Sequence, residues 1–446
     1  MTFGPSGAAA RPVRAPLAET AFVAVLLALS AASAAPALGA AGDAAWLFGC
    51  MLAALALLGA FRKDEAREQV VDAHVLAAPA ALMGLAAVAT VLASTPLAPG
   101  GVHPIWASVG RRGGASLDRE GLWLGLLQLG GLAAVFLAAL FAGLKGDRAR
   151  GLIPAISAMA LVLGVCDFVP GAAVPGTQGE AGGALFGLAL ILSAATVLSR
   201  RRALKDAAQR GGAGQGGGES EVSPLGVIRA APLSGIVALA SATALVLINR
   251  PALAACAAVL LLLLALWEFI AGGRSGGLQR GASLVLMAVF AALALATGAL
   301  VLQKFGGLPD PETHPLFGTH LTALQASPWM GYGLDSTEAM LRLNADRLNL
   351  ASLAGAPASP PLYLLWVEQG GLIAALAFGA GLAAIIVEIG LRSAGRRRTS
   401  GLMRAVVAAS AFLALAGLVN AGPAAPQVAT IWALLLGLGL ARAIAA

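Results

Sequence analysis

Charged residues are scarce in this chain. Asp, Glu, Lys and Arg make up 11% of its 446 residues, whereas soluble domains carry about 25%. Hydrophobic residues make up 59%, and the mean hydropathy is +0.84. This scarcity of charge excludes an ordinary soluble domain and indicates a protein of the lipid bilayer.

Cysteine is nearly absent as well. Cys50, Cys166 and Cys256 each lie inside an apolar run, and no CxxC pair occurs. This spacing excludes a disulfide framework and a cysteine-ligated metal site, so we expect three small buried hydrophobic side chains.

The few charges that occur are mostly basic. The net charge is +7 and the sequence pI is about 10.0, which in a soluble protein would suggest a nucleic-acid partner. In a chain this apolar, the excess fits basic cytoplasmic loops facing anionic lipid. We therefore expect the membrane, and no nucleic acid, as a partner.

Apolar runs recur along the chain. A membrane span needs about 20 predominantly apolar residues, and the small residues that dominate these runs allow helices to pack closely in lipid. We predict an all-α polytopic integral membrane protein that forms a single membrane domain over residues 1–446, with about twelve transmembrane helices. The predicted spans are 18–40, 45–61, 70–94, 121–144, 152–170, 183–199, 232–248, 252–271, 282–303, 362–391, 404–421 and 426–441.

The basic residues give the predicted orientation. With both termini in the cytoplasm, 22 of the 29 Lys and Arg residues fall on the cytoplasmic side, as the positive-inside rule requires. The loops at 95–120, 171–182 and 304–361 then face outside. The Gly-rich segment 200–230 is predicted to be a flexible cytoplasmic linker.

The large outside loop, between predicted helices nine and ten, is the place where chemistry is expected. Ionisable groups and non-helical backbone are tolerated near a membrane only where protein or water satisfies them. The segment 304–371 holds both kinds of feature, including His314, His320 and, just inside the next span, Glu368.

One part of this loop has helical character. In residues 335–353, Asp335 is a candidate N-cap, with Glu338 completing a capping box, and Glu338 and Arg342 share a charged face. We predict an amphipathic helix that lies on the membrane surface. Such a helix could grip a substrate or merely cover the bundle.

Five segments, in this order, resemble motifs of the O-antigen ligase and polysaccharide polymerase superfamily. The similarity covers the chain from about residue 95 to its end, although each motif alone is weak. The segment 323–336 carries Pro328, Gly331 and Gly333, and the segment 362–376 carries Tyr363 and Glu368. The segments are HPIWASVG (103–110), ALVLINRPALAACAAVLLLLL (244–264), ALQASPWMGYGLDS (323–336), LYLLWVEQGGLIAAL (362–376) and LVNAGPAAPQVATIWALLLGLGLA (418–441).

The resemblance implies a membrane glycosyltransferase of the bacterial inner membrane. Members of this superfamily move a glycan from a polyprenyl-diphosphate carrier to a lipid or glycan acceptor on the outer face, in surface polysaccharide or lipopolysaccharide assembly. They use no metal or other cofactor. Ligase and polymerase share these motifs, so the two activities stay open here.

The chain departs from the superfamily where catalysis is concerned. The histidine proposed as the family's catalytic base is replaced by Pro360 and Pro361, and the acid of its last span by Asn420. His320 or His314 could supply the missing base, and Glu368 could share the site or orient a neighbouring arginine. Alternatively, each histidine only makes local hydrogen bonds.

Four residues are predicted to bind substrate. Arg250 matches the family's arginine and could meet the diphosphate or pair with Glu368, although it could also only cap a turn. Arg342 and Arg347 are further candidates for diphosphate or sugar contact, and Tyr363 belongs to the closing motif.

Two other classes of function stay open. A non-catalytic relative that binds lipid-linked glycan or scaffolds an assembly complex would not need the missing histidine. A transporter is disfavoured because no internal repeat is evident.

Overall fold

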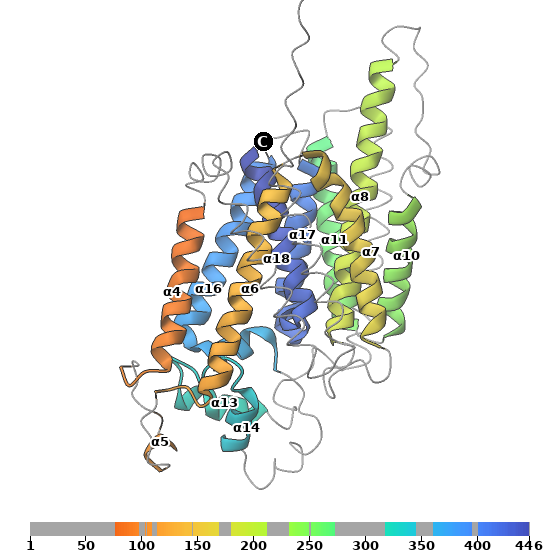
Figure 1. Ribbon diagram of the computed structural model, residues 1–446. Helices are drawn as coiled ribbons and strands as arrows, with labels where there is room; N and C mark the ends of the chain where they lie inside the picture. Colours follow the sequence, from red (N-terminus) through yellow and green to blue (C-terminus); the bar gives the residue numbers. More distant parts are fainter. Residues whose placement is uncertain are drawn as a thin grey trace, which may run out of the picture.

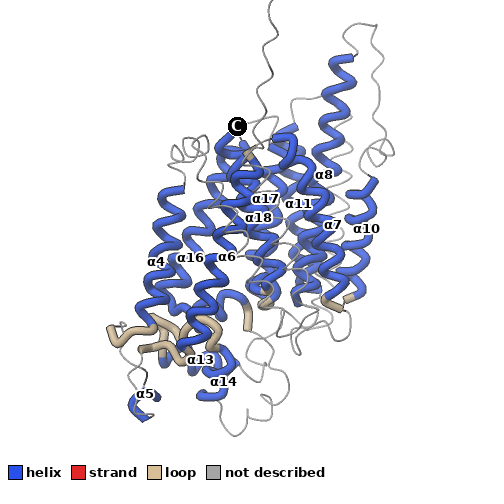
Figure 2. Tube along the Cα trace, viewed as in Figure 1, coloured by secondary structure: helices blue, strands red, loops and turns tan. Residues whose placement is uncertain are grey.

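The computed structural model describes eleven parts of the chain, and within them all regular secondary structure is helical (Figure 2). The prediction of an all-α fold is thereby confirmed for these residues. They are 76–97, 103, 105–108, 114–144, 146–168, 180–211, 232–248, 251–272, 317–344, 360–394 and 400–445.

The helices form one elongated bundle (Figure 1). In chain order they are α4 (Ala77–Ala93), α5 (Ile105–Ser108), α6 (Arg119–Gly143), α7 (Gly146–Cys166), α8 (Glu180–Gly211), α10 (Pro232–Leu247), α11 (Pro251–Gly272), α13 (Phe317–Ala326), α14 (Thr337–Asn344), α16 (Leu362–Ala394), α17 (Ser400–Val419), the short 3₁₀ helix η4 (Gly422–Ala424) and α18 (Pro426–Ala445).

Five helices in the described part are long and apolar enough to cross a membrane. They are α6, α8, α16, α17 and α18, and the apolar stretches of α4, α7, α10 and α11 are shorter. Nine of the twelve predicted spans therefore correspond to apolar helices. The other three predicted spans, 18–40, 45–61 and 282–303, lie outside the described residues.

Small residues set the packing of the bundle, as expected for helices in lipid. Where α6 crosses α18, a Cβ atom at Gly437 would lie 2.2 Å from the Phe136 carbonyl oxygen, so only glycine permits this approach. In a second pair of helices, α4 packs on α16 through alanines, and Ala86 and Ala374 lie in the buried contact.

Several connections meet at one end of the bundle, where α13 and α14 lie below the spans in Figure 1. The Leu117 N–H donates to the Tyr332 carbonyl at 2.7 Å, and the Leu362 N–H donates to the Asn420 carbonyl at 3.2 Å. Two of the loops that the distribution of basic residues predicts to face outside, 95–120 and 304–361, are thus hydrogen-bonded to each other.

Two local expectations need correction. Residues 200–211 continue α8 as helix, so this part of the predicted linker is not flexible coil. Residues 212–230 lie outside the described residues.

The predicted amphipathic helix corresponds to α14, which begins at Thr337. Its N-cap position is therefore Ser336, one residue later than predicted. Asp335 instead has a positive φ of 60°.

The apolar face of α14 also differs from the prediction. Met340 and Leu341 are buried against Ala323 and Tyr332, so in the described part of this helix the apolar side meets protein. The predicted continuation, 345–353, lies outside the described residues. Amphipathic periodicity specifies that one face is covered, but it does not distinguish lipid from protein as the cover.

Candidate active site

A break in α16 defines the candidate site. Gly371 has φ 72° and ψ 171°, which interrupts the helix shortly after it begins. The freed backbone groups are satisfied by the turn that joins α13 to α14. The Leu372 N–H donates to the Pro328 carbonyl at 2.9 Å, and the N–H groups of Tyr332 and Gly333 donate to the carbonyls of Glu368 at 2.7 Å and Gln369 at 2.9 Å.

Glycine makes this contact possible. A Cβ atom at Gly331, where φ is +62°, would lie 2.5 Å from the Glu368 carbonyl oxygen. Gly331 belongs to the PWMGYG segment and Glu368 to the EQGG segment. Two motifs that the sequence presents separately are therefore docked on each other through their backbones.

This docking brings His320 and Glu368 together. His320, on α13, places Nδ1 2.7 Å from Oε1 of Glu368, on α16. Both side chains are at most 2% exposed. An ionised carboxylate only accepts hydrogen bonds, so the pairing of an ionised Glu368 with a neutral imidazole requires the proton on Nδ1 and leaves a lone pair on Nε2.

The other polar atom of each side chain is also buried. Within the described part of the chain, Nε2 of His320 and Oε2 of Glu368 have no hydrogen-bond partner. Buried polar atoms without partners are rare because they lose hydration without compensation. A histidine oriented by a carboxylate, with its second nitrogen unengaged, has the arrangement of a general base.

Tyr332 lies beside the pair. Its hydroxyl donates to the Ala323 carbonyl at 2.9 Å, and its side chain is almost completely buried. Burial raises the pKa of Tyr332, a hydrogen bond with Asn344 lowers it, and the nearby Glu368 carboxylate raises it. The phenol is therefore a neutral hydrogen-bond donor at physiological pH.

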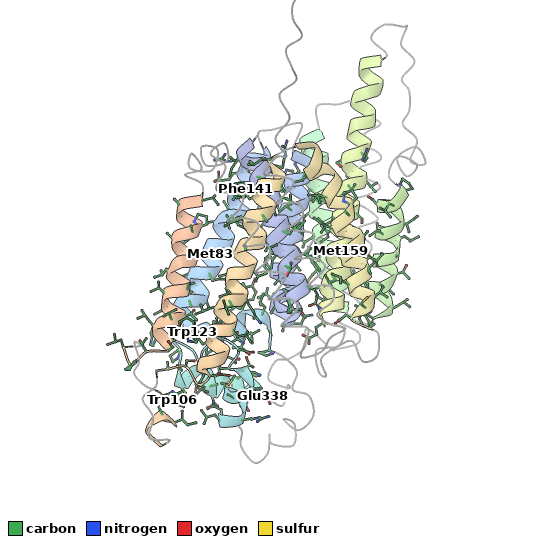
Figure 3. All side chains as sticks on the ribbon, viewed as in Figure 1. Met83, Trp106, Trp123, Phe141, Met159 and Glu338 are labelled. Carbon is green, nitrogen blue, oxygen red and sulfur yellow. The ribbon has the colours of Figure 1, made fainter. Side chains whose placement is uncertain are left out.

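The other predicted residues that the structure describes lie away from the pair. Arg342 is exposed on α14 and forms an ion pair with Glu338, which is exposed as well and lies at the lower end of the bundle in Figure 3. Tyr363 donates its hydroxyl to the Ala414 carbonyl at 2.9 Å. Tyr363 and Glu368 are five residues apart, which puts them on different sides of α16.

Three predicted site residues, Arg250, His314 and Arg347, lie outside the residues whose surroundings are described. Among the described residues, the partner of Glu368 is His320; the predicted contact of Glu368 with Arg250 lies outside them. Among the described residues, no group of three His, Cys, Asp or Glu side chains could hold a metal ion.

Comparison of the chain with protein-family models and with curated proteins finds no match. The chemistry of the site is therefore inferred from the His320–Glu368 pair and from the ordered motifs.

Sequence reasoning missed Tyr332 and the backbone contacts at Gly371. A signal was present, since Gly370 and Gly371 follow a carboxylate inside an apolar run, and adjacent glycines favour a break in a helix. Nothing local in the sequence, however, indicates which segment satisfies the backbone groups that such a break frees.

Proposed function

We propose that this protein is a membrane glycosyltransferase, with His320 as general base and Glu368 as the carboxylate that orients it. It transfers a glycan from a polyprenyl-diphosphate carrier to a hydroxyl group of a lipid or glycan acceptor, in surface polysaccharide assembly at the outer face of the bacterial inner membrane. The observation that carries the proposal is the buried contact between Nδ1 and Oε1 at 2.7 Å, in which Nε2 has no hydrogen-bond partner among the described residues.

The proposed reaction needs one proton transfer. Nε2 of His320 takes the proton from the acceptor hydroxyl as its oxygen attacks the anomeric carbon of the donor glycan. The bond between that carbon and the phosphate oxygen breaks, and polyprenyl diphosphate leaves with the bonding electron pair. Glu368 stabilises the imidazolium that forms, and both side chains are held in place before the reaction.

Two further observations support this assignment. His320 supplies a base in a chain where Pro360 and Pro361 replace the histidine of the resembling family. Its helix also lies at the end of the bundle where the loops predicted to face outside are joined to one another. For the leaving diphosphate, Arg250 and Arg347 are the candidate cations. Arg342 is a weaker one, because its charge is paired with Glu338.

The proposal is tested by His320→Gln, which removes the basic nitrogen and retains a polar side chain. Surface polysaccharide is measured in cells in which the variant is the only copy, and the protein level is measured in parallel. We expect transfer to fall about 10²–10⁴-fold, the usual contribution of a general base. The control is Thr322→Val, which removes an exposed hydroxyl from the same helix.

Wild-type polysaccharide in His320→Gln cells, at equal protein level, would overturn the enzymatic role. It would favour a protein that binds lipid-linked glycan or scaffolds an assembly complex.

A further inference from the structure

Tyr332 is hydrogen-bonded to both helices that carry the buried pair. Its hydroxyl donates to the Ala323 carbonyl at 2.9 Å, in the last turn of α13. Its backbone N–H donates to the carbonyl of Glu368 itself at 2.7 Å. One residue thus contacts the helix of His320 through its side chain and the residue Glu368 through its backbone.

These contacts form a closed ring. The ring begins with the side-chain hydrogen bond between His320 and Glu368, and the Glu368 carbonyl then accepts a hydrogen bond from the Tyr332 N–H. The Tyr332 hydroxyl bonds to the Ala323 carbonyl, and one turn of α13 leads from Ala323 back to His320. A closed ring of hydrogen bonds fixes the relative position of two helices more firmly than a single contact. The separation of Nδ1 and Oε1 therefore depends on the phenol.

Tyr332 is held firmly on its other side as well. Its carbonyl accepts a hydrogen bond from the Leu117 N–H at 2.7 Å, and its ring lies 5.8 Å from that of His103. The segment before α6 thereby fixes the backbone of Tyr332, so that its hydroxyl bonds to α13 from a fixed position.

We infer that Tyr332 is a positioning residue, whose hydroxyl holds α13 so that His320 keeps its hydrogen bond with Glu368. The catalytic consequence rests on the proposed function, whereas the geometric consequence does not. Phenylalanine would fill the same space, and the buried hydroxyl is favourable only because a carbonyl receives it. Its role is therefore the contact with Ala323.

The test compares Tyr332→Phe with the wild-type full-length protein in lipid bilayers, using ¹⁵N-histidine NMR. The signal of His320 is identified by its loss in His320→Gln. We expect the wild type to show one tautomer, protonated at Nδ1, and Tyr332→Phe to show a mixture of both tautomers. Thr322→Val also removes a hydroxyl that donates to a backbone carbonyl at 2.9 Å, and it should keep the wild-type signal.

Glycan transfer is measured on the same proteins, with lipid-linked glycan extracted from cells that lack the protein. We expect kcat to fall about tenfold in Tyr332→Phe, with KM unchanged, because misplacement of a base slows the chemical step without weakening substrate binding. A wild-type tautomer signal in Tyr332→Phe would overturn the inference. A tautomer shift without transfer by the wild-type protein would support the positioning role and refute the proposed function.

Asn344→Ala provides a second variant if Tyr332→Phe does not accumulate. The Asn344 side chain lowers the pKa of the Tyr332 phenol and donates to the Met340 carbonyl at 2.9 Å, so its removal leaves the ring in place and loosens the surroundings of the hydroxyl. We expect a smaller shift toward the same tautomer mixture. An unchanged His320 signal in Asn344→Ala would contradict the positioning role.

Discussion

Gly371 lies directly against the carbonyl group of Trp329. A Cβ atom at Gly371 would be 2.1 Å from the Trp329 oxygen, and its φ of 72° is in a region that favours glycine. The interrupted helix α16 and the turn before α14 therefore fit together only when residue 371 has no side chain.

Gly371→Ala should separate these two segments. The left-handed backbone alone costs an alanine about 1–2 kcal/mol, and the contact with Trp329 adds to this. We expect a lower thermal unfolding midpoint in detergent and loss of glycan transfer. Gly379→Ala is the control on the same helix, because nothing lies within 4 Å of its added Cβ. Equal effects of the two substitutions would show that the contact at Gly371 is unimportant.

Glu368→Gln should slow transfer while the protein still accumulates. The amide can accept the Nδ1 hydrogen bond, but it lacks the negative charge that stabilises the imidazolium. We expect a loss of about 10²–10⁴-fold in transfer, measured as surface polysaccharide at matched protein level. Glu388→Gln, which breaks the ion pair with Arg392 in the same helix, should leave transfer near wild type. A loss of the same size in both variants would argue for a general effect of charge in α16.

Two leucines of α14 can show whether protein or lipid covers the apolar face of this helix. Leu341 is 2% exposed in the contact with α13, whereas Leu343 is 40% exposed. Leu341→Ala should lower the free energy of unfolding by about 2–5 kcal/mol, as for other buried leucines. Leu343→Ala should change it by about 0.5 kcal/mol or less, measured by denaturant unfolding in detergent. A larger effect of Leu343→Ala would restore the membrane-surface interpretation.

Acid should destabilise the contact between His103 and Tyr332. Burial lowers the pKa of His103, and its Nδ1 accepts a hydrogen bond from the Ile105 N–H at 3.3 Å. Above the ordinary histidine pKa of about 6.5, the side chain is neutral in both the folded and the unfolded chain. Below that value His103 binds a proton in the unfolded chain before it does so in the folded chain. The free energy of unfolding therefore decreases as the pH is lowered, until the pH is below the lowered pKa of His103 in the folded chain.

The measurement for this prediction is the thermal midpoint at pH 7.5 and at pH 5.5 in the wild type and in His103→Phe. The wild type should lose more stability than the variant between the two pH values, because the other histidines are present in both. The same loss in both proteins would exclude His103 as the source.

The orientation can be tested with reporter fusions. A reporter joined at Gly216 should lie in the cytoplasm and one joined at Asn344 outside, as the distribution of basic residues predicts. Alkaline phosphatase should then be active only at Asn344, and a fluorescent protein only at Gly216. Matching signals at both positions would refute the predicted topology.

The sequence predicts the apolar helices well because the signal for each one is local. The run at 121–144 corresponds to the helix Gly121–Gly143 and the run at 426–441 to the helix Pro426–Ile444, and both helices are long and apolar enough to cross a membrane. A continuous apolar run has few alternatives to a helix in lipid, since every backbone group must be satisfied within the segment.

The pairing within the candidate site could not be predicted in the same way. His320 and Glu368 are each recognisable as polar groups near apolar spans, but 48 residues separate them. Their contact depends on a helix break at Gly371 and on a turn that docks there, which is a tertiary relationship. The contacts of α14 could not be predicted for a related reason, because an amphipathic pattern does not show whether protein or lipid covers the apolar face.

The break at Gly371 also changes how the length of α16 fits a bilayer. The apolar stretch Leu362–Ser393 has 32 residues, and at a rise of about 1.5 Å per residue it would be about 48 Å long, well beyond the roughly 30 Å of hydrocarbon. The part after Gly371 alone is about 33 Å long and is sufficient to span that thickness. With the part after Gly371 as the span, Glu368 lies outside the hydrocarbon, although it belongs to the same apolar stretch. The side chain of Glu368 is then buried in protein beside His320 and has no contact with lipid tails.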